Sequence, residues 1–490
     1  MMKLLKHTIL LFGACSLILV SSCKKFLDVE PVDRLGSNSF WKTKSDVESA
    51  VADCYGLIYD RLTVGPYHNL NGDIRAGEFI CPGFPVFPTV AKNDLSNSSQ
   101  IALPARYKGD LLADWYPFYQ AIAACNIALD RLDELTFLDN NEKARYKAEV
   151  KFIRAFTYFY ISRIYGDVPL YTKAYDGTAK GRTNFIDVLK FCIQELEETK
   201  EALPWQYTDP TNWGVRASRA SSETLIANCY MWIAGFDKSN QQVYWQKAAD
   251  AALNVKNSGF FQLLPIEDFK KIFKGKTRES IFEFSVNKNY GSETKYVSLG
   301  QWSTHAPIVN YGSTSDGYYL ASYVQKLYPA NAPDKRRDVW FYLPYINNTT
   351  QMFLKYSNVT DVNNFLFDDN MIIFRYSGIL LLGAEALANL GKNGEAIPLL
   401  NMVRNRAGAT EYSPSESSLV DAVFMEEQKE LIGEGVRWYD LIRTGRVMDI
   451  GQCVDFLTPE QFNQGAWTWP INPKARVNNP NIVLNQYWVK

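Results

Sequence analysis

The chain has 490 residues, with 52 Lys and Arg against 53 Asp and Glu, and 47% of its residues are hydrophobic. A net charge near zero gives no basis for nucleic-acid binding. The length and hydrophobic content instead indicate a globular protein, either one large domain or two interleaved ones.

Residues 1–22 have the pattern of a secretory signal. An apolar run of about 13 residues, from Thr8 to Val20, follows two lysines and is too short to span a bilayer. It ends in Val20-Ser21-Ser22-Cys23, which resembles a bacterial lipobox, in which cleavage precedes a cysteine that carries a diacylglyceride. An ordinary secretory signal with a chance cysteine is the alternative. We predict a lipoprotein signal peptide over 1–22, lipidation at Cys23, and a lipidated tether over 23–44.

The rest of the chain, 45–490, is predicted to be a body built on helical hairpins, which fall within 45–62, 112–260 and 371–447. The clearest hairpin lies between Met371 and Gly408. A stripe with helical spacing runs from Tyr376 to Leu390, stops at a Gly-Lys-Asn-Gly turn and is followed by a second stripe. Small residues such as Gly383 predict a close approach of two helix backbones, as in tetratricopeptide repeats.

The cysteines show neither a disulfide framework nor metal-site spacing. Four of them are predicted to face a helical core: Cys54, Cys125, Cys192 and Cys229. The pattern leaves open whether these four, Cys81 or Cys453 form disulfides.

Two stretches, 64–110 and 285–370, lack long helical stripes and are rich in loop-forming residues. Before the second, Phe282, Phe284 and Val286 alternate with polar residues, which predicts a strand. Between Ser285 and Tyr345 nearly all aromatic residues are Tyr or Trp, the ring types favoured on wet binding surfaces. The predicted fold is mainly α: a tetratricopeptide-like solenoid with an irregular, loop-rich lobe carrying a few short strands.

A charged motif runs from Glu430 to Asp440. Its acidic residues suggest chemistry, but Glu430, Glu434 and Arg437 have helical spacing. We interpret the motif as an ion-paired helix face.

Five motifs in order resemble the SusD/RagB family of outer-membrane nutrient-binding lipoproteins. They are the lipobox, Arg154-Ala155-Phe156-Thr157-Tyr158-Phe159 running to Tyr165-Gly166-Asp167-Val168-Pro169-Leu170, Arg375-Tyr376 with the Ala384-Glu385-Ala386-Leu387 helix, Glu430 to Leu441, and the closing Trp469-Pro470-Ile471 with Asn479-Pro480-Asn481 and Asn485-Gln486-Tyr487. The resemblance covers nearly the whole chain.

The resemblance implies a cell-surface lipoprotein, anchored in the outer membrane and facing the exterior, that binds oligosaccharides or polysaccharide. It also implies a partner, a SusC-like TonB-dependent transporter, to which the ligand is delivered, and neither catalysis nor a cofactor. Lys24-Lys25 after Cys23 departs from the acidic run often associated with surface export, so the outward orientation depends on the resemblance.

Other functions remain open on sequence alone. The ligand could be peptides, as in the RagB branch of the family. The chain could also be a surface glycoside hydrolase, because two carboxylates suffice for that chemistry, or a scaffold without a ligand. Metal chemistry is not indicated, since no zinc-type histidine spacing occurs.

We predict the ligand site on the irregular lobe, near residues 290–320 and the loop around Asp73. Trp302, in a polar loop, is the leading candidate for a ring on which a sugar stacks, and Tyr296 and Tyr311 would extend the arc. Asp73 and Arg75 would supply polar groups, because the family places part of its binding surface on the equivalent loop. The alternative is that Trp302 closes the lobe's own small core.

Overall fold

The structure is a computed structural model that describes residues 40–63, 66–84, 86–95, 113–287, 296–477 and 479–489. Cys23 and the predicted signal peptide lie outside these residues. The chain divides into two compact units, Met1–Ser49 and Ala50–Lys490. The described part of the first unit contains the start of helix α3 (Lys44–Leu62), where Asp46 accepts the backbone N–H groups of Lys42 and Thr43.

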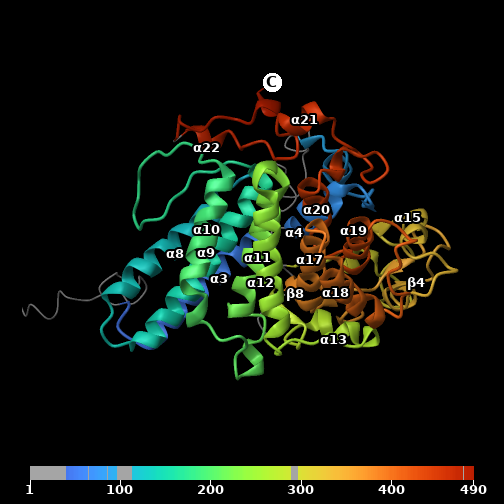
Figure 1. The fold of residues 1–490 in the computed structure, drawn as a ribbon, viewed down its shortest axis with the longest axis horizontal. Coiled ribbons are helices and arrows are strands. Elements are labelled where there is room, and N and C mark those ends of the chain that lie inside the picture. The colour runs from blue at the N-terminus through green and yellow to red at the C-terminus, as the bar shows by residue number, and fades with distance from the viewer. Residues whose placement is uncertain are drawn as a thin grey trace, which may run out of the picture. The chain divides into compact units, whose positions relative to one another are not determined.

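Long helices form the main part of the second unit. Between α3 and the first pair of long helices lie the short helices α4 (Tyr67–Gly72) and α5 (Val86–Ala91). The long helices are α8 (Tyr116–Glu134), α9 (Asn140–Tyr165), α10 (Phe185–Thr199), α11 (Arg219–Phe236), α12 (Gln241–Asn257), α17 (Tyr376–Asn389), α18 (Asn393–Arg406) and α19 (Leu419–Glu430). From α8 to α12 each packs against the next, and α12 packs against α17 (Figure 1). This confirms the predicted solenoid of hairpins.

Gly383 marks a close approach between two helices of this solenoid. A Cβ atom built on it would lie 2.8 Å from Cβ of Ala252 on α12, but 3.5 Å from Cδ1 of Leu399 on α18. The small residue therefore serves the contact between successive hairpins more than the contact within its own. The four cysteines predicted to face the core are buried, and each has a free thiol.

The lobe is an insertion between α12 and α17, two helices that remain neighbours across it. Its elements are short: α13 (Phe269–Lys274), α14 (Leu299–Ser303), α15 (Ala321–Leu327) and α16 (Arg336–Trp340). The strands form antiparallel pairs: β1 (Phe79–Ile80) with β3 (Tyr318–Tyr319), β2 (Ser280–Phe284) with β8 (Met371–Arg375), β4 (Phe341–Tyr342) with β5 (Met352–Phe353), and β6 (Val359–Asp361) with β7 (Leu366–Phe367).

The predicted strand at Phe282 is β2, but it has no polar face. Glu283 is buried with its apolar neighbours, and its Oε1 accepts hydrogen bonds from Asn370 Nδ2 at 2.9 Å and from the backbone of Lys276 at 2.6 Å. Burial nevertheless raises the pKa of Glu283 to about 6. The pair β2 and β8 thus forms a buried floor where the lobe meets the helices.

The prediction that Glu430, Glu434 and Arg437 share one helix face is wrong. Helix α19 ends at Glu430, the chain turns through Gly433 (φ 79°) and Gly435 (φ 74°), and α20 (Arg437–Arg443) begins after the turn. Left-handed φ angles favour glycine, so these two residues break the helix that the charge spacing suggested. The charged side chains are ion-paired, but with residues far away in sequence.

The described residues of the first loop-rich stretch, 66–84 and 86–95, do not form an exposed loop. Most of its side chains are buried, including those of Tyr67, His68 and Leu70. It packs against the turn after α19, where a Cβ atom on Gly72 would lie 1.9 Å from the carbonyl oxygen of Gly435.

The C-terminal residues complete the unit. They contain α21 (Pro459–Asn463) and α22 (Lys474–Val477), and in Figure 1 this red segment crosses one end of the long helices. Among the described residues, no helix is both long and apolar enough to cross a membrane.

We predict that the free energy of unfolding of Gly383→Ala is about 1–3 kcal/mol lower than that of Gly378→Ala, because overpacking costs about that much and the gain in helix propensity is common to both variants. Gly378→Ala is the matched control on the same helix, since its Cβ would meet Leu431 only at an ordinary 3.7 Å. Alanine favours a helix by up to about 1 kcal/mol over glycine, so this control is expected to be neutral or stabilising. Urea denaturation of both variants measures the difference, and two equal shifts would contradict the close approach.

Candidate functional site

The structure buries four of the five residues predicted to bind ligand. Trp302 is 5% exposed, and its ring centroid lies 5.5 Å from that of Phe84 and 4.9 Å from that of Phe87. Tyr296 is equally enclosed, and burial raises the pKa of its hydroxyl well above the ordinary value. Trp302 therefore has the position that the alternative reading gave it, in the lobe's own core.

Asp73 and Arg75 are also interior residues. Oδ2 of Asp73 accepts hydrogen bonds from Asn69 Nδ2 at 3.0 Å and from the backbone N–H of Gly435 at 2.7 Å. The Arg75 guanidinium donates to Asn93 Oδ1 at 2.7 Å and lies 4.4 Å from the ring centroid of Trp438. Both side chains join the segment after α3 to the C-terminal part of the chain.

Tyr311 differs from the other four because 49% of it is exposed. Its ring centroid lies 4.7 Å from that of Phe365, on the turn between β6 and β7, at an interplanar angle of 36°. Nearby, Asn310 donates from its backbone to Val362 O at 2.8 Å and from Nδ2 to Asn363 Oδ1 at 2.6 Å. We call Tyr311, Phe365, Asn310 and Asn363 the Tyr311 platform.

The turn that carries Phe365 is built by its own side chains. Asp361 accepts the backbone N–H groups of Asn363 at 2.9 Å and Asn364 at 3.0 Å, as Asx turns do. Phe365 has a left-handed φ of 56°. The platform thus combines an exposed ring, a ring that supports it and amide groups at its edge, which is the arrangement that stacks on a sugar and hydrogen-bonds its hydroxyls.

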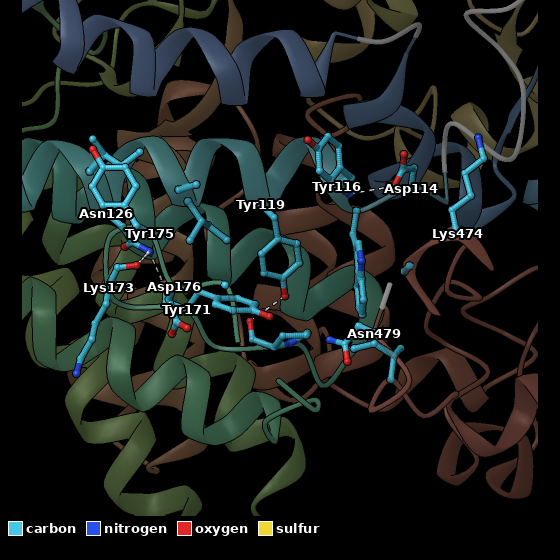
Figure 2. Close-up of a pocket in the computed structure, with 18 residues that line it drawn as sticks. Asp114, Tyr116, Tyr119, Asn126, Tyr171, Lys173, Tyr175, Asp176, Lys474 and Asn479 are labelled. Carbon is cyan, nitrogen blue, oxygen red and sulfur yellow. Dashed lines mark hydrogen bonds between the residues drawn. The ribbon is translucent and has the colours of Figure 1, made fainter. Parts of the chain in front are cut away.

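A second place where rings gather is a pocket of about 880 Å³, which we call the aromatic pocket (Figure 2). It lies between the first half of α8, the loop 169–177 and the C-terminal stretch 474–482. Five rings line it: those of Trp115, Tyr116, Tyr119, Tyr171 and Tyr175. Figure 2 shows Tyr116 and Tyr119 projecting from α8 and Tyr171 and Tyr175 from the loop.

This pocket was not predicted, because its lining residues lie outside the two loop-rich stretches, 64–110 and 285–370, in which the ligand site was expected. The core stripe of α8 includes Phe118, Ile122 and Cys125, which are buried. Tyr116 and Tyr119 flank that stripe. Large rings beside a core stripe rather than on it were the signal that could have identified this wall.

The fold and these sites place the chain among helical-repeat proteins with a loop-rich lobe inserted between two hairpins. Family models match two consecutive stretches: one described as "SusD family" matches residues 236–488, and one described as "Starch-binding associating with outer membrane" matches residues 25–231. The chain belongs to the SusD family.

Relatives support this assignment over the whole length. SusD-like protein P38 of Formosa agariphila is 26% identical over 513 aligned positions, covering 96% of each chain. A solved SusD homologue from Bacteroides thetaiotaomicron is 33% identical, with a TM-score of 0.82 over 91% of this chain and 98% of that one. Surface glycan-binding protein A from B. thetaiotaomicron, solved in complex with laminarihexaose, shares the fold at 21% identity, with a TM-score of 0.68 over 91% of this chain and all of that one.

We predict that Trp302→Ala unfolds at a temperature several degrees lower than the wild type, since removing a buried Trp ring costs about 3–5 kcal/mol. Thermal unfolding followed by circular dichroism measures the shift. Phe137→Ala, at a 45% exposed ring after α8, is the control and should leave the melting temperature unchanged. A Trp302→Ala protein that melts as wild type would contradict the core position.

We predict that Asp73 makes stability fall as pH rises. Burial raises the pKa of Asp73 to about 7, so between pH 4 and pH 7 the folded state holds a proton that the unfolded state has released. Asp73→Asn keeps the oxygen that accepts from Asn69 and Gly435 but cannot ionise.

The free energy of unfolding of Asp73→Asn, relative to wild type, should therefore rise between pH 5 and pH 7 by about 1 kcal/mol per pH unit. Urea denaturation at pH 5, 6 and 7 tests this. A difference independent of pH would show that the carboxyl does not titrate in this range.

Proposed function

We propose that the protein binds carbohydrate outside the cell and delivers it to a TonB-dependent, SusC-like transporter in the outer membrane. Membership of the SusD family supports the role. The observation in this chain that carries it is the Tyr311 platform, where a half-exposed ring is held on Phe365 beside amide groups. In this proposal lipidation at Cys23 anchors the protein to the outer membrane, facing the exterior.

The platform suits a sugar because a sugar has both an apolar ring face and polar hydroxyl groups, and the platform has a partner for each. A pyranose ring presents a face of C–H bonds that packs on an aromatic ring, while its hydroxyls need donors and acceptors beside that ring. Asn310 and Asn363 supply amide groups there. The other four candidates, Trp302, Tyr296, Asp73 and Arg75, would act beneath the surface, by holding the lobe and the segment after α3 in place.

The proposed activity is binding without turnover. Several carboxylates of the charged motif, including Glu430 and Glu434, are buried in ion pairs with Arg375. They therefore support the fold in this proposal and do not serve as an acid and base pair for hydrolysis.

The test begins with native gels that contain a panel of polysaccharides, run beside a peptide mixture. We expect retardation by at least one polysaccharide, no release of shorter sugars from it, and co-purification of a much larger barrel protein when the lipoprotein is extracted in mild detergent. Retention of peptides in place of glycans, or turnover that follows the protein through purification, would contradict the proposal.

Tyr311→Ala should then weaken binding of the retained glycan about tenfold, because a stacking contact contributes about 0.5–1.5 kcal/mol beyond its burial. The exposure of the ring predicts an unchanged melting temperature. Phe137→Ala removes a comparably exposed ring elsewhere and should bind as wild type. Unchanged affinity in Tyr311→Ala would remove the platform from the site.

A further inference from the structure

We infer that the aromatic pocket is a second carbohydrate-binding site, independent of the Tyr311 platform, for a short stretch of a linear, uncharged oligosaccharide. The inference rests on the proposed function for its ligand class. It adds a separate site, built from α8, the loop 169–177 and the C-terminal stretch.

The size and shape of the pocket suit such a ligand. Its volume of about 880 Å³ falls in the range of ligand pockets, about 300–1,000 Å³. In Figure 2 Tyr175 and Tyr116 lie toward opposite ends of the pocket, with Tyr171 and Tyr119 between them. A row of rings gives successive sugar units successive faces on which to stack.

The side-chain donors of three lining residues, Tyr119, Tyr171 and Asn126, are already paired within the protein. Tyr119 donates its hydroxyl hydrogen to Pro169 O at 2.8 Å, and Tyr171 donates to Thr178 O at 2.8 Å. Asn126 donates to the carbonyl oxygens of Tyr171 and Lys173 and accepts from Arg154 at 2.5 Å. A ligand that covers these groups leaves none of them buried without a partner, so covering them carries little desolvation cost.

This pairing also decides the class of ligand. Because the donors of these three side chains are in use, they offer a ligand ring faces more than a specific pattern of polar groups. Asp176 in the loop is neutralised by Lys180 at 2.8 Å, and the rim carries charges of both signs in Asp114, Lys173 and Lys474. The pocket therefore favours an uncharged ligand with flat apolar faces and outward hydroxyls.

The loop wall is fixed before any ligand arrives. Tyr158 donates to Tyr171 O at 2.9 Å and accepts from Tyr171 N at 2.7 Å, while Arg154, paired with Glu195, donates to Thr172 O at 3.3 Å. A rigid wall lowers the entropy that binding would otherwise lose by ordering the loop.

Tyr175 is a second, independent sign of a ligand contact. It adopts a left-handed φ of 55°, which is uncommon for a residue with a side chain, and is 70% exposed. Packing of the exposed Tyr175 ring does not offset the cost of this backbone conformation. The conformation instead places the ring at the mouth of the pocket, as expected of a residue that contacts a ligand.

The test counts binding sites. Hexasaccharides of the glycan retained in the gels are titrated by calorimetry into wild type, Tyr311→Ala, the double variant Tyr116→Ala/Tyr175→Ala, and the triple variant. Tyr116 and Tyr175 are 62% and 70% exposed, so all four proteins should melt at the same temperature. We expect two ligands per wild-type molecule. In Tyr311→Ala and in the double variant one of the two sites should bind about tenfold more weakly, and in the triple variant both sites should.

Other results separate the two proposals. A single ligand per wild-type molecule that Tyr311→Ala weakens about tenfold and the double variant binds as wild type would overturn the second site and leave the proposed function intact. A single ligand that the double variant weakens and Tyr311→Ala binds as wild type would support the pocket and remove the platform. No binding of any oligosaccharide by wild type would overturn both.

Discussion

The arrangement of this protein depends on one buried arginine. Arg375, at the junction of β8 and α17, donates to Glu279 at 2.8 Å, to Glu430 at 2.7 Å and to Glu434 at 2.6 Å. These residues come from the lobe's first strand region and from the end of α19, so the one guanidinium joins segments far apart in sequence. Removing one member of such a buried group leaves unpaired charges and costs about 3–5 kcal/mol, although an apolar set of the same shape can be as stable. We therefore expect the network to fix the relative positions of the segments that it joins more than to add to the free energy of unfolding.

Local periodicity explains where sequence reasoning succeeded, and the network explains where it failed. Hairpins such as α17 and α18 follow from local periodicity and from the glycines that end each helix, and the structure has them where the pattern indicated. The prediction for the Glu430 motif failed because its charges pair across the fold: Glu430 with Arg375 at 2.7 Å, and Glu434 with Lys355 of the lobe at 2.5 Å. Helical spacing within a motif cannot reveal a partner that is 55 or 79 residues away.

The candidate site shows the same limit. Tyr and Trp enrichment correctly marked the lobe as aromatic, but enrichment does not say which rings face solvent. Trp302 is covered by Phe84 and Phe87, which the chain brings from more than 200 residues earlier, whereas Tyr311 stacks on Phe365 and stays half-exposed. The aromatic pocket needs three distant segments, and only the wall on α8 left a sequence signal.

Charged and aromatic residues thus have separate tasks in this chain. The charges that look most like chemistry are buried at the junction of solenoid and lobe, where Arg375 and Lys355 hold Glu434. The accessible rings lie on loops that are themselves anchored, Phe365 by the Asp361 turn and Tyr175 by the pairing of Asp176 with Lys180. A rigid frame that carries neutral stacking surfaces can hold a polymer weakly at separate points, and a weakly held polymer can be released. Release matters under the proposed role in delivery, because a site that bound a whole chain through buried charges would retain it.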